Sequence, residues 1–147
     1  MSFDNESAPE PLDVTDSPSP RDIQLLEDSI DEFNMSSTGI RDARLLAIMH
    51  HDRDARLVAG LYGWTWGGCC EIKTFWIDEQ WRGRGLGTHL IQAAETEARD
   101  RGATQIVLST HSFQAPRFYQ RFGFEIVGQV NDYPAGYQSI YMRKHLR

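Results

Sequence analysis

The segment WRGRGLGT, residues 81–88, constrains the fold of this chain more than any other stretch. It follows TFWID, a run of residues that favour strands. After it, apolar residues recur every four positions, at Leu86, Leu90, Ala94 and Ala98. This pattern predicts a strand, a glycine-rich turn and a helix from about Gly85 to Asp100, with Gly102 as its stop. Such a turn directs unpaired backbone N–H groups and the positive end of a helix dipole at one point, which favours an anion.

The glycines and arginines of this segment favour a phosphate-bearing ligand, because missing Cβ atoms allow close approach and guanidinium groups add positive charge. They are Arg82, Gly83, Arg84, Gly85 and Gly87. The P-loop pattern is absent, since no Gly-Lys-Ser/Thr follows. The dinucleotide pattern also fails, because the glycine spacing is one residue short of GxGxxG and no acidic residue ends the next strand. The segment therefore indicates a different phosphate carrier.

The distribution of charge argues against a nucleic-acid partner. Residues 1–20 contain five acidic residues and no Lys or Arg, so they account for most of the net charge of -6. The rest of the chain is nearly balanced, whereas nucleic-acid binders show a large basic surplus. Residues 1–10 have the polar, acidic composition of a disordered segment, and we expect a single domain over residues 11–147.

Cysteine and histidine usage indicates neither a disulfide nor a metal. The two cysteines, Cys69 and Cys70, are adjacent and cannot close a loop, and the five histidines lack the spacing of metal ligands. The sequence has no long apolar run and no leader with a basic segment. We therefore expect a cytoplasmic protein that binds neither a metal nor a membrane.

Local patterns along the remaining sequence predict an α+β fold. A short strand is expected around Leu12 and Val14, and then a helix capped by Ser19 with Pro20 at its first position. Further strands are expected over residues 43–51, 55–66, 69–78, 105–110, 125–130 and 138–146, and a short helix over 114–124. The first three of these strands should form an antiparallel meander, because short polar or glycine turns join them.

Two segments resemble signatures of the GNAT superfamily of N-acetyltransferases. WIDEQWRGRGLG, residues 76–87, is similar to its coenzyme A signature, Arg/Gln-x-x-Gly-x-Gly/Ala, with Arg82, Gly85 and Gly87 in place. APRFYQRFGF, residues 115–124, is similar to its second signature, Ala-x-x-Phe-Tyr-x-x-x-Gly-Phe. The resemblance covers roughly residues 12–146. It implies a mixed, mostly antiparallel sheet of about seven strands with a splay between the fourth and fifth, flanked by about three to four helices.

The resemblance also implies where acetyl-CoA binds. Its pantetheine would lie in the splay and pair with the main chain of residues 75–77, and its pyrophosphate would rest on residues 82–88. The cofactor-binding residues implied in this way are Phe75, Trp76, Ile77, Arg82, Gly83, Arg84, Gly85, Leu86, Gly87, Thr88, Ser112 and Phe118. Ser112 stands where many members of the family have an asparagine, which weakens that contact.

Acetyl transfer to an amine needs a neutral nucleophile, a stabilised oxyanion and a proton for the departing thiolate. Tyr119 occupies the position where the family commonly has its general acid. The amide of Phe75 or Ile77 is the implied oxyanion donor. For the base we favour Glu71, because period-two alternation places Glu71, Lys73, Phe75 and Ile77 on one face of their strand. His111, Asp132 or water are alternatives.

These observations indicate an N-acetyltransferase that moves the acetyl group of acetyl-CoA to a primary amine of a small molecule or peptide, by direct attack in a ternary complex. The alternative is a non-catalytic acyl-CoA sensor on the same fold. The stretch of residues 111–134 resembles a bacterial branch of the family. A homodimer is possible, with residues 138–146 as its interface.

Overall fold

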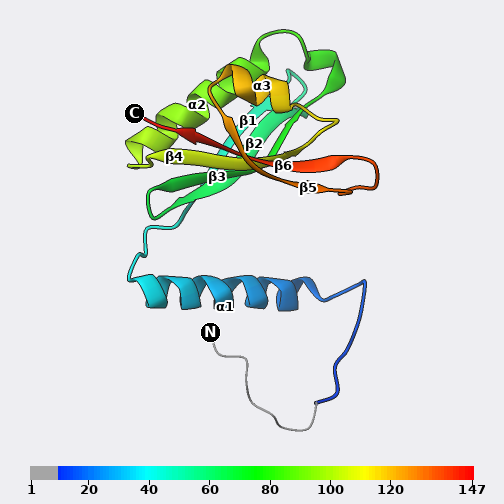
Figure 1. Cartoon of the computed structure of the whole chain (residues 1–147), viewed down its shortest axis with the longest axis vertical. Helices are drawn as coiled ribbons and strands as arrows, with labels where there is room; N and C mark the ends of the chain where they lie inside the picture. Colours follow the sequence, from blue (N-terminus) through cyan, green and yellow to red (C-terminus); the bar gives the residue numbers. More distant parts are fainter. Residues whose placement is uncertain (1–9) are drawn as a thin grey trace. The chain divides into compact units, whose positions relative to one another are not determined.

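The computed structural model describes residues 10–147, and the chain forms two compact units, Met1–Gly39 and Ile40–Arg147. Figure 1 shows the order of the elements in both units. The expected disordered segment, residues 1–10, lies outside the described residues except for its last member. The first unit contains the helix α1 (Pro20–Thr38), and the second contains the sheet and the other helices.

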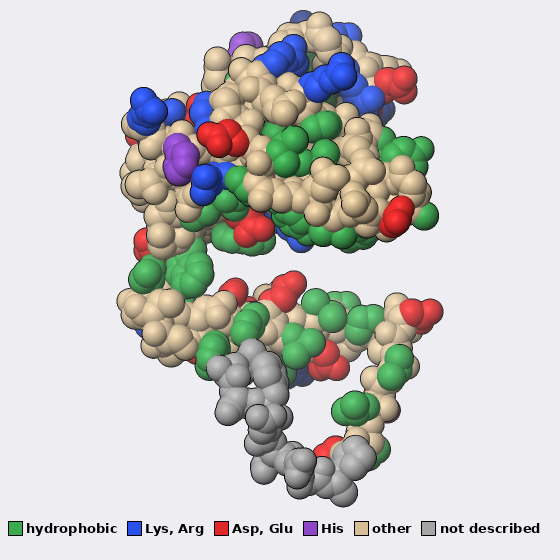
Figure 2. All heavy atoms as spheres, viewed as in Figure 1, with side chains coloured by type: hydrophobic (Ala, Val, Ile, Leu, Met, Phe, Trp, Pro, Cys, Tyr) green, Lys and Arg blue, Asp and Glu red, His purple; other side chains and the backbone are tan. Residues whose placement is uncertain are grey.

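Local signals mark both ends of α1, and its start lies where the sequence predicts it. The helix begins after Ser19, with Pro20 at its first position, and Gly39 at its end takes the left-handed conformation (φ 72°) and donates its N–H to Met35 O. Hydrophobic side chains are exposed along this helix, as Figure 2 shows. The strand predicted around Leu12 and Val14 is absent, because this short stretch pairs with no neighbouring strand in the described chain.

The second unit is built on one six-stranded sheet with the order β1-β2-β3-β4-β6-β5. Its strands are β1 (Arg44–His51), β2 (Leu57–Trp66), β3 (Cys69–Ile77), β4 (Gln105–His111), β5 (Glu125–Asn131) and β6 (Gln138–His145). All neighbours are antiparallel except β3 and β4. The fold is therefore the predicted mixed α+β architecture, with one strand fewer than expected because the N-terminal strand does not form.

Two helices, α2 (Leu86–Asp100) and α3 (Pro116–Arg121), lie on the same face of this sheet (Figure 1). The main core fills the space between that face and the helices, and α2 contributes Leu90, Ile91, Ala94 and Ala98 to it. Glu95 of α2 also forms an ion pair with Lys144 of β6, at 2.6 Å. None of the helices within residues 10–147 has the length and apolar character that a membrane span requires.

The sheet is split along part of the boundary between β3 and β4. These strands pair over four positions only, from Cys69 opposite Gln105 to Ile72 opposite Leu108. Beyond that point β3 continues to Ile77 and β4 to His111 without pairing to each other. The predicted splay is therefore present, between the third and fourth strands of the observed sheet.

Candidate functional site

A cavity of about 690 Å³ opens where β3 and β4 part. It is lined by the second half of β3, the end of β4, the loop that follows β4 and the helix α3. The lining residues are Ile72, Lys73, Thr74, Phe75, Trp76, Ile77, Arg82, Leu108, Ser109, Thr110, Phe113, Gln114, Ala115, Phe118 and Tyr119. Six of the residues predicted to bind cofactor or act in catalysis line this cavity: Phe75, Trp76, Ile77, Arg82, Phe118 and Tyr119.

A β-bulge at Lys73 controls which residues of β3 face the core. Tyr62 of β2 pairs with Thr74, and its neighbour Gly63 pairs with Ile72, so Lys73 has no opposite residue on β2. One inserted residue reverses the alternation of side chains. As a result Ile72 and Phe75 both contribute to the helix-covered core, although they stand an odd number of positions apart in the sequence.

The predicted common face of Glu71, Phe75 and Ile77 is therefore wrong. Glu71 precedes the bulge and lies opposite Trp64 of β2, on the face of the sheet that turns away from the helices. Its side chain is exposed and is not part of the cavity lining. Period-two reasoning holds only along an unbroken strand, and the inserted Lys73 breaks the period between Glu71 and Phe75.

The glycine-rich turn between β3 and α2 presents free backbone amides. Gly83 and Gly85 have positive φ angles of 73° and 78°, and an added Cβ at either position would meet no atom within 4 Å. The first backbone bond into α2 runs from His89 N to Gly85 O. Across the part of the chain that the structure describes, the amides of residues 83–88 donate no hydrogen bond. The predicted anion site thus has its donors available at a helix N-terminus.

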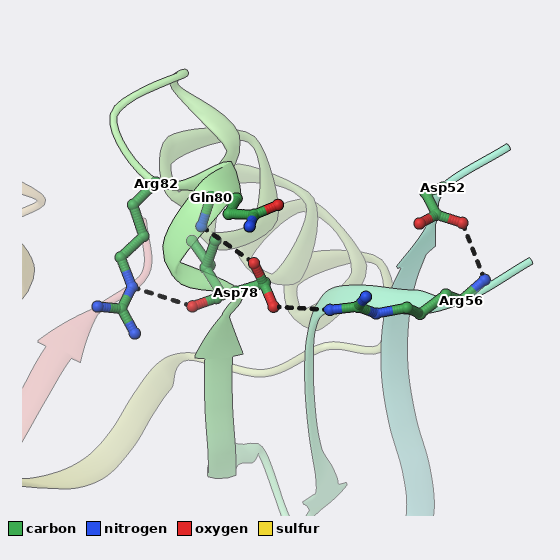
Figure 3. A network of polar contacts seen from close by, with 6 residues as sticks. Asp52, Arg56, Asp78, Gln80 and Arg82 are labelled. Carbon is green, nitrogen blue, oxygen red and sulfur yellow. Dashed lines mark hydrogen bonds and ion pairs between the residues drawn. The ribbon is translucent and has the colours of Figure 1, made fainter. Parts of the chain in front are cut away.

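Polar contacts fix the start of this turn. The Asp78 Oδ1 accepts a hydrogen bond from Gln80 N at 3.0 Å, and its Oδ2 lies 3.3 Å from the Arg56 guanidinium (Figure 3). This carboxylate therefore caps the short 3-10 helix η1 (Glu79–Trp81) that leads into the turn. Arg82 Nε donates to Ile77 O at 3.0 Å, which holds the Arg82 guanidinium beside the cavity (Figure 3).

Positive charge is concentrated near the turn. The Arg84 guanidinium lies over the Trp81 ring, 5.0 Å from its centroid. Arg121 of α3 lies over the Phe118 ring at 5.7 Å. Figure 2 shows Lys and Arg side chains at the end of this unit that carries the turn and α3. These charges favour an anionic ligand at the helix N-terminus.

Close packing joins the turn to the second signature segment. A Cβ added to Gly87 would lie 3.1 Å from the Phe118 ring and 3.3 Å from Ile77 Cδ1. Glycine at this position therefore lets the first turn of α2 lie against β3 and α3. Phe118 also contacts the Phe75 ring, with centroids 5.8 Å apart. The two segments that resemble family signatures thus meet at the cavity.

Tyr119 is buried at the wall of the cavity, with 6% of its surface exposed. Its ring packs against Phe75, Phe118 and Phe124, at centroid distances of 6.0, 5.2 and 5.7 Å. Burial raises the pKa of Tyr119 to about 12, because the phenolate would lose hydration. The hydroxyl is therefore protonated at neutral pH.

Ser112 does not line the cavity. Its Oγ accepts a hydrogen bond from Gln138 N at 3.0 Å, and its N donates to Gln138 O at 2.9 Å. These bonds tie the loop after β4 to the start of β6. The predicted cofactor contact of Ser112 is thus not supported by its position, and the residue holds two loops together.

Several residues at the cavity are not among those predicted from the sequence. Gln114 Oε1 accepts a hydrogen bond from His111 N at 2.7 Å and lies 3.3 Å from Thr110 Oγ1, so it shapes the loop beside the cavity. Gln114 immediately precedes the second signature segment, and this position is the sequence feature that could have indicated its place at the cavity. Within residues 10–147, no three His, Cys, Asp or Glu side chains are grouped to hold a metal ion.

Comparisons with known proteins identify the family of this chain. The Acetyltransferase (GNAT) family matches residues 9–124. Blasticidin-S acetyltransferase of Streptomyces morookaense is 39% identical over 94 residues, which cover 61% of this chain and 67% of the relative. A crystal structure of an acetyltransferase from Bacillus cereus has a TM-score of 0.75 at 24% identity, over 91% of this chain and 98% of that chain. An aminoglycoside 6'-N-acetyltransferase complexed with coenzyme A has a TM-score of 0.62 at 17% identity, over 89% of this chain and 96% of that chain.

The split sheet, the glycine-rich turn and the family match define a class of protein: the chain belongs to the GNAT family of acetyltransferases. It is an acetyl-CoA-dependent acyltransferase, with acetyl-CoA as the acyl-donor cosubstrate. The residues described above fit this cosubstrate, because the free amides and arginines of the turn suit a pyrophosphate and the unpaired edge of β3 suits an extended amide chain.

Proposed function

We propose that this protein transfers the acetyl group of acetyl-CoA to a primary amine of a small molecule or peptide, by direct attack within a ternary complex. The observation that carries the proposal is the cavity between β3 and β4, whose lining includes Arg82 at the start of the glycine-rich turn and a protonated, buried Tyr119. The name of the Streptomyces relative supports a small-molecule acceptor, since that relative acetylates blasticidin S.

The donor would be held by two backbone surfaces. Residues 83–88 would bind the pyrophosphate through their amides, with charge from Arg82 and Arg84. Phe75, Trp76 and Ile77 would bind the pantetheine through the edge of β3 that pairs with no strand beyond Ile72. A backbone N–H on the same edge would also stabilise the oxyanion of the reacting thioester carbonyl.

Tyr119 would supply the proton to the departing thiolate. Its high pKa keeps the hydroxyl protonated, and its place in the cavity wall supports this role. The position of Glu71 on the opposite face, outside the cavity, supports no contact with the reacting amine. The amine would enter in its neutral form, or lose its proton to water, His111 or Asp132.

A pair of glycine variants tests the donor site. Gly85 and Gly102 both have positive φ and open space where a Cβ would be added, but only Gly85 belongs to the turn at the cavity. Gly85→Ala and Gly102→Ala should each lose about 1–2 kcal/mol of folding free energy through backbone strain. Only Gly85→Ala should bind acetyl-CoA more weakly in titration calorimetry. Equal affinity in the two variants would contradict the assignment of the turn.

Release of free thiol from acetyl-CoA, measured across a panel of primary amines, tests the reaction itself. We expect release that depends on the amine and on an intact Tyr119. Tight binding of acetyl-CoA with no release for any amine would instead indicate the acyl-CoA sensor.

A further inference from the structure

Four aromatic side chains, one at the end of β4 and three in the loops after β4 and β5, form one connected cluster beside the cavity. We call His111, Phe113, Tyr133 and Tyr137 the aromatic shelf. The His111 ring stacks parallel to Phe113, with centroids 5.3 Å apart and an interplanar angle of 1°. Tyr133 and His111 form a T-shaped pair with centroids 5.4 Å apart, and Tyr137 and Phe113 form another at 5.1 Å. These contacts join the loop after β4 to the loop between β5 and β6.

Three of the four shelf side chains remain about half exposed although they contact each other. Phe113, Tyr133 and Tyr137 are 55%, 58% and 48% exposed. Adjacent exposed apolar groups mark binding surfaces more often than isolated ones do. Phe113 also lines the cavity between β3 and β4, so the shelf continues the wall of that cavity into solvent.

Hydrogen bonds hold the shelf in place. His111 Nδ1 lies 3.0 Å from Tyr133 O, and because a carbonyl only accepts, Nδ1 carries the proton. Within the second loop, Tyr133 N donates to Tyr137 O at 3.3 Å and Tyr137 N donates to Pro134 O at 2.9 Å. The reciprocal bonds between Ser112 and Gln138 connect the two loops. The rings are therefore ordered before any ligand arrives, which lowers the entropy lost on binding.

We propose that the aromatic shelf is the binding site for the acceptor, and that it selects amines that carry a planar aromatic ring. An aromatic ring gains stacking or edge-to-face contacts on Phe113 and its neighbours that a saturated ring of similar size does not gain. Before it loses its proton, the ammonium group of the acceptor is also attracted by aromatic faces. His111 is a positioning residue here, since it fixes both Phe113 and Tyr133. This inference rests on the proposed acetyl transfer for its chemistry, but the binding site itself is testable without turnover.

Phenethylamine and cyclohexylethylamine are a suitable pair of probes, because they share the amine and chain and differ in the ring. With the full-length protein we expect phenethylamine to bind about fivefold more tightly in titration calorimetry, the ratio that one aromatic contact supplies. The KM values for thiol release from acetyl-CoA should differ in the same direction. Phe113→Leu should bring both ratios close to one, and Phe113→Tyr should restore them.

Tyr141→Leu is the matched control. Tyr141 of β6 is 44% exposed, like the shelf tyrosines, but it belongs neither to the shelf contacts nor to the cavity lining. This variant should keep the wild-type preference. Equal affinities for the two amines, or an unchanged preference in Phe113→Leu, would overturn the proposal. Tighter binding of phenethylamine in calorimetry without thiol release would support the shelf as a binding site and refute acetyl transfer. Thiol release with equal KM values for the two amines would support acetyl transfer and refute the shelf.

Discussion

Gly63 is the residue that permits the bulge in β3. A Cβ added at Gly63 would lie 1.7 Å from Glu71 O and 2.8 Å from Glu71 C, because the bulged strand brings its backbone close to β2 at this point. No rotation of a side chain relieves a clash with backbone atoms. Glycine at position 63 therefore allows the close approach at which the alternation of β3 side chains is interrupted at Lys73.

Gly63→Ala should lower the free energy of unfolding by about 1–3 kcal/mol, because the extra methyl group forces the two strands apart. Chemical denaturation measures this loss. Gly128→Ala is the control, since Gly128 is also a strand glycine at a register shift but has open space where a Cβ would be added. A loss no greater than that of the control would show that the bulge relaxes without cost.

Tyr119→Phe removes a hydroxyl and keeps the ring that packs on Phe75 and Phe118. If Tyr119 protonates the thiolate, kcat should fall by about 100-fold, the scale of general acid catalysis. The affinity for acetyl-CoA should stay close to that of the wild type, because the phenylalanine preserves the cavity wall. Steady-state kinetics with saturating amine measures kcat, and calorimetry measures the affinity for acetyl-CoA. A wild-type kcat in the variant would show that Tyr119 is not the general acid.

The raised pKa of Tyr119 also predicts a pH profile. The protonated phenol is the active form, so activity is lost only as the pH rises through a pKa of about 12. An ordinary tyrosine titrates near pH 10 and would give a falling limb there. We therefore expect kcat at saturating amine to show no fall between about pH 7 and pH 10. A fall centred near pH 10 in the wild type, missing in Tyr119→Phe, would contradict the buried position of the hydroxyl.

At the scale of elements, the ion pair between Glu95 and Lys144 fastens α2 to β6. Both side chains are largely buried, and Arg99 adds a second cation 3.6 Å from the Glu95 carboxylate. Glu95→Ala leaves the Lys144 ammonium without this partner, so unfolding free energy should drop by about 1–3 kcal/mol. Arg56→Ala breaks an exposed pair with Asp78 and should cost less than about 1 kcal/mol. Equal losses in denaturation experiments would contradict the difference in burial.

Local signals explain which elements the sequence predicts well. Ser19 with Pro20, Gly39, Gly102 and Gly123 mark helix boundaries through their own backbone preferences, and the observed helices end beside them. The strand expected at Leu12 fails because a strand needs a partner, which no local pattern supplies. The bulge at Lys73 was missed for the same reason, since it depends on how Gly63 of another strand approaches Glu71. The predicted face of Glu71 is wrong for this reason, because the prediction assumed an unbroken strand.

At the scale of the whole molecule, strand order limits how two copies could associate. The segment predicted as a dimer interface forms β6, and both edges of β6 are already paired, with β4 and β5. The outer strands of the described sheet are β1 and β5. All of β5 is exposed, including Ile126, Val127 and Val130. An unprotected apolar edge strand favours pairing with another chain.

If the protein forms a homodimer, β5 is therefore the strand that should mediate it. Val127→Lys places a charge on this edge and should shift the sedimentation coefficient from dimer to monomer. Leu45→Lys, on an exposed position of β1 at the opposite edge, is the control and should leave the association unchanged. Dissociation by the β1 variant alone would assign the interface to the other edge.

The four paired positions between β3 and β4 limit how much the width of the cavity between these strands can vary. The separation of the two strands is determined by where main-chain pairing stops, after the pair of Ile72 and Leu108, and by the backbone of the two diverging strands. Side chains of the loop after β4 line the cavity, but the separation of the two strands does not depend on them. Under the proposed assignment, substitutions in these loops can therefore change the acceptor preference while the strand separation proposed to hold the donor stays the same.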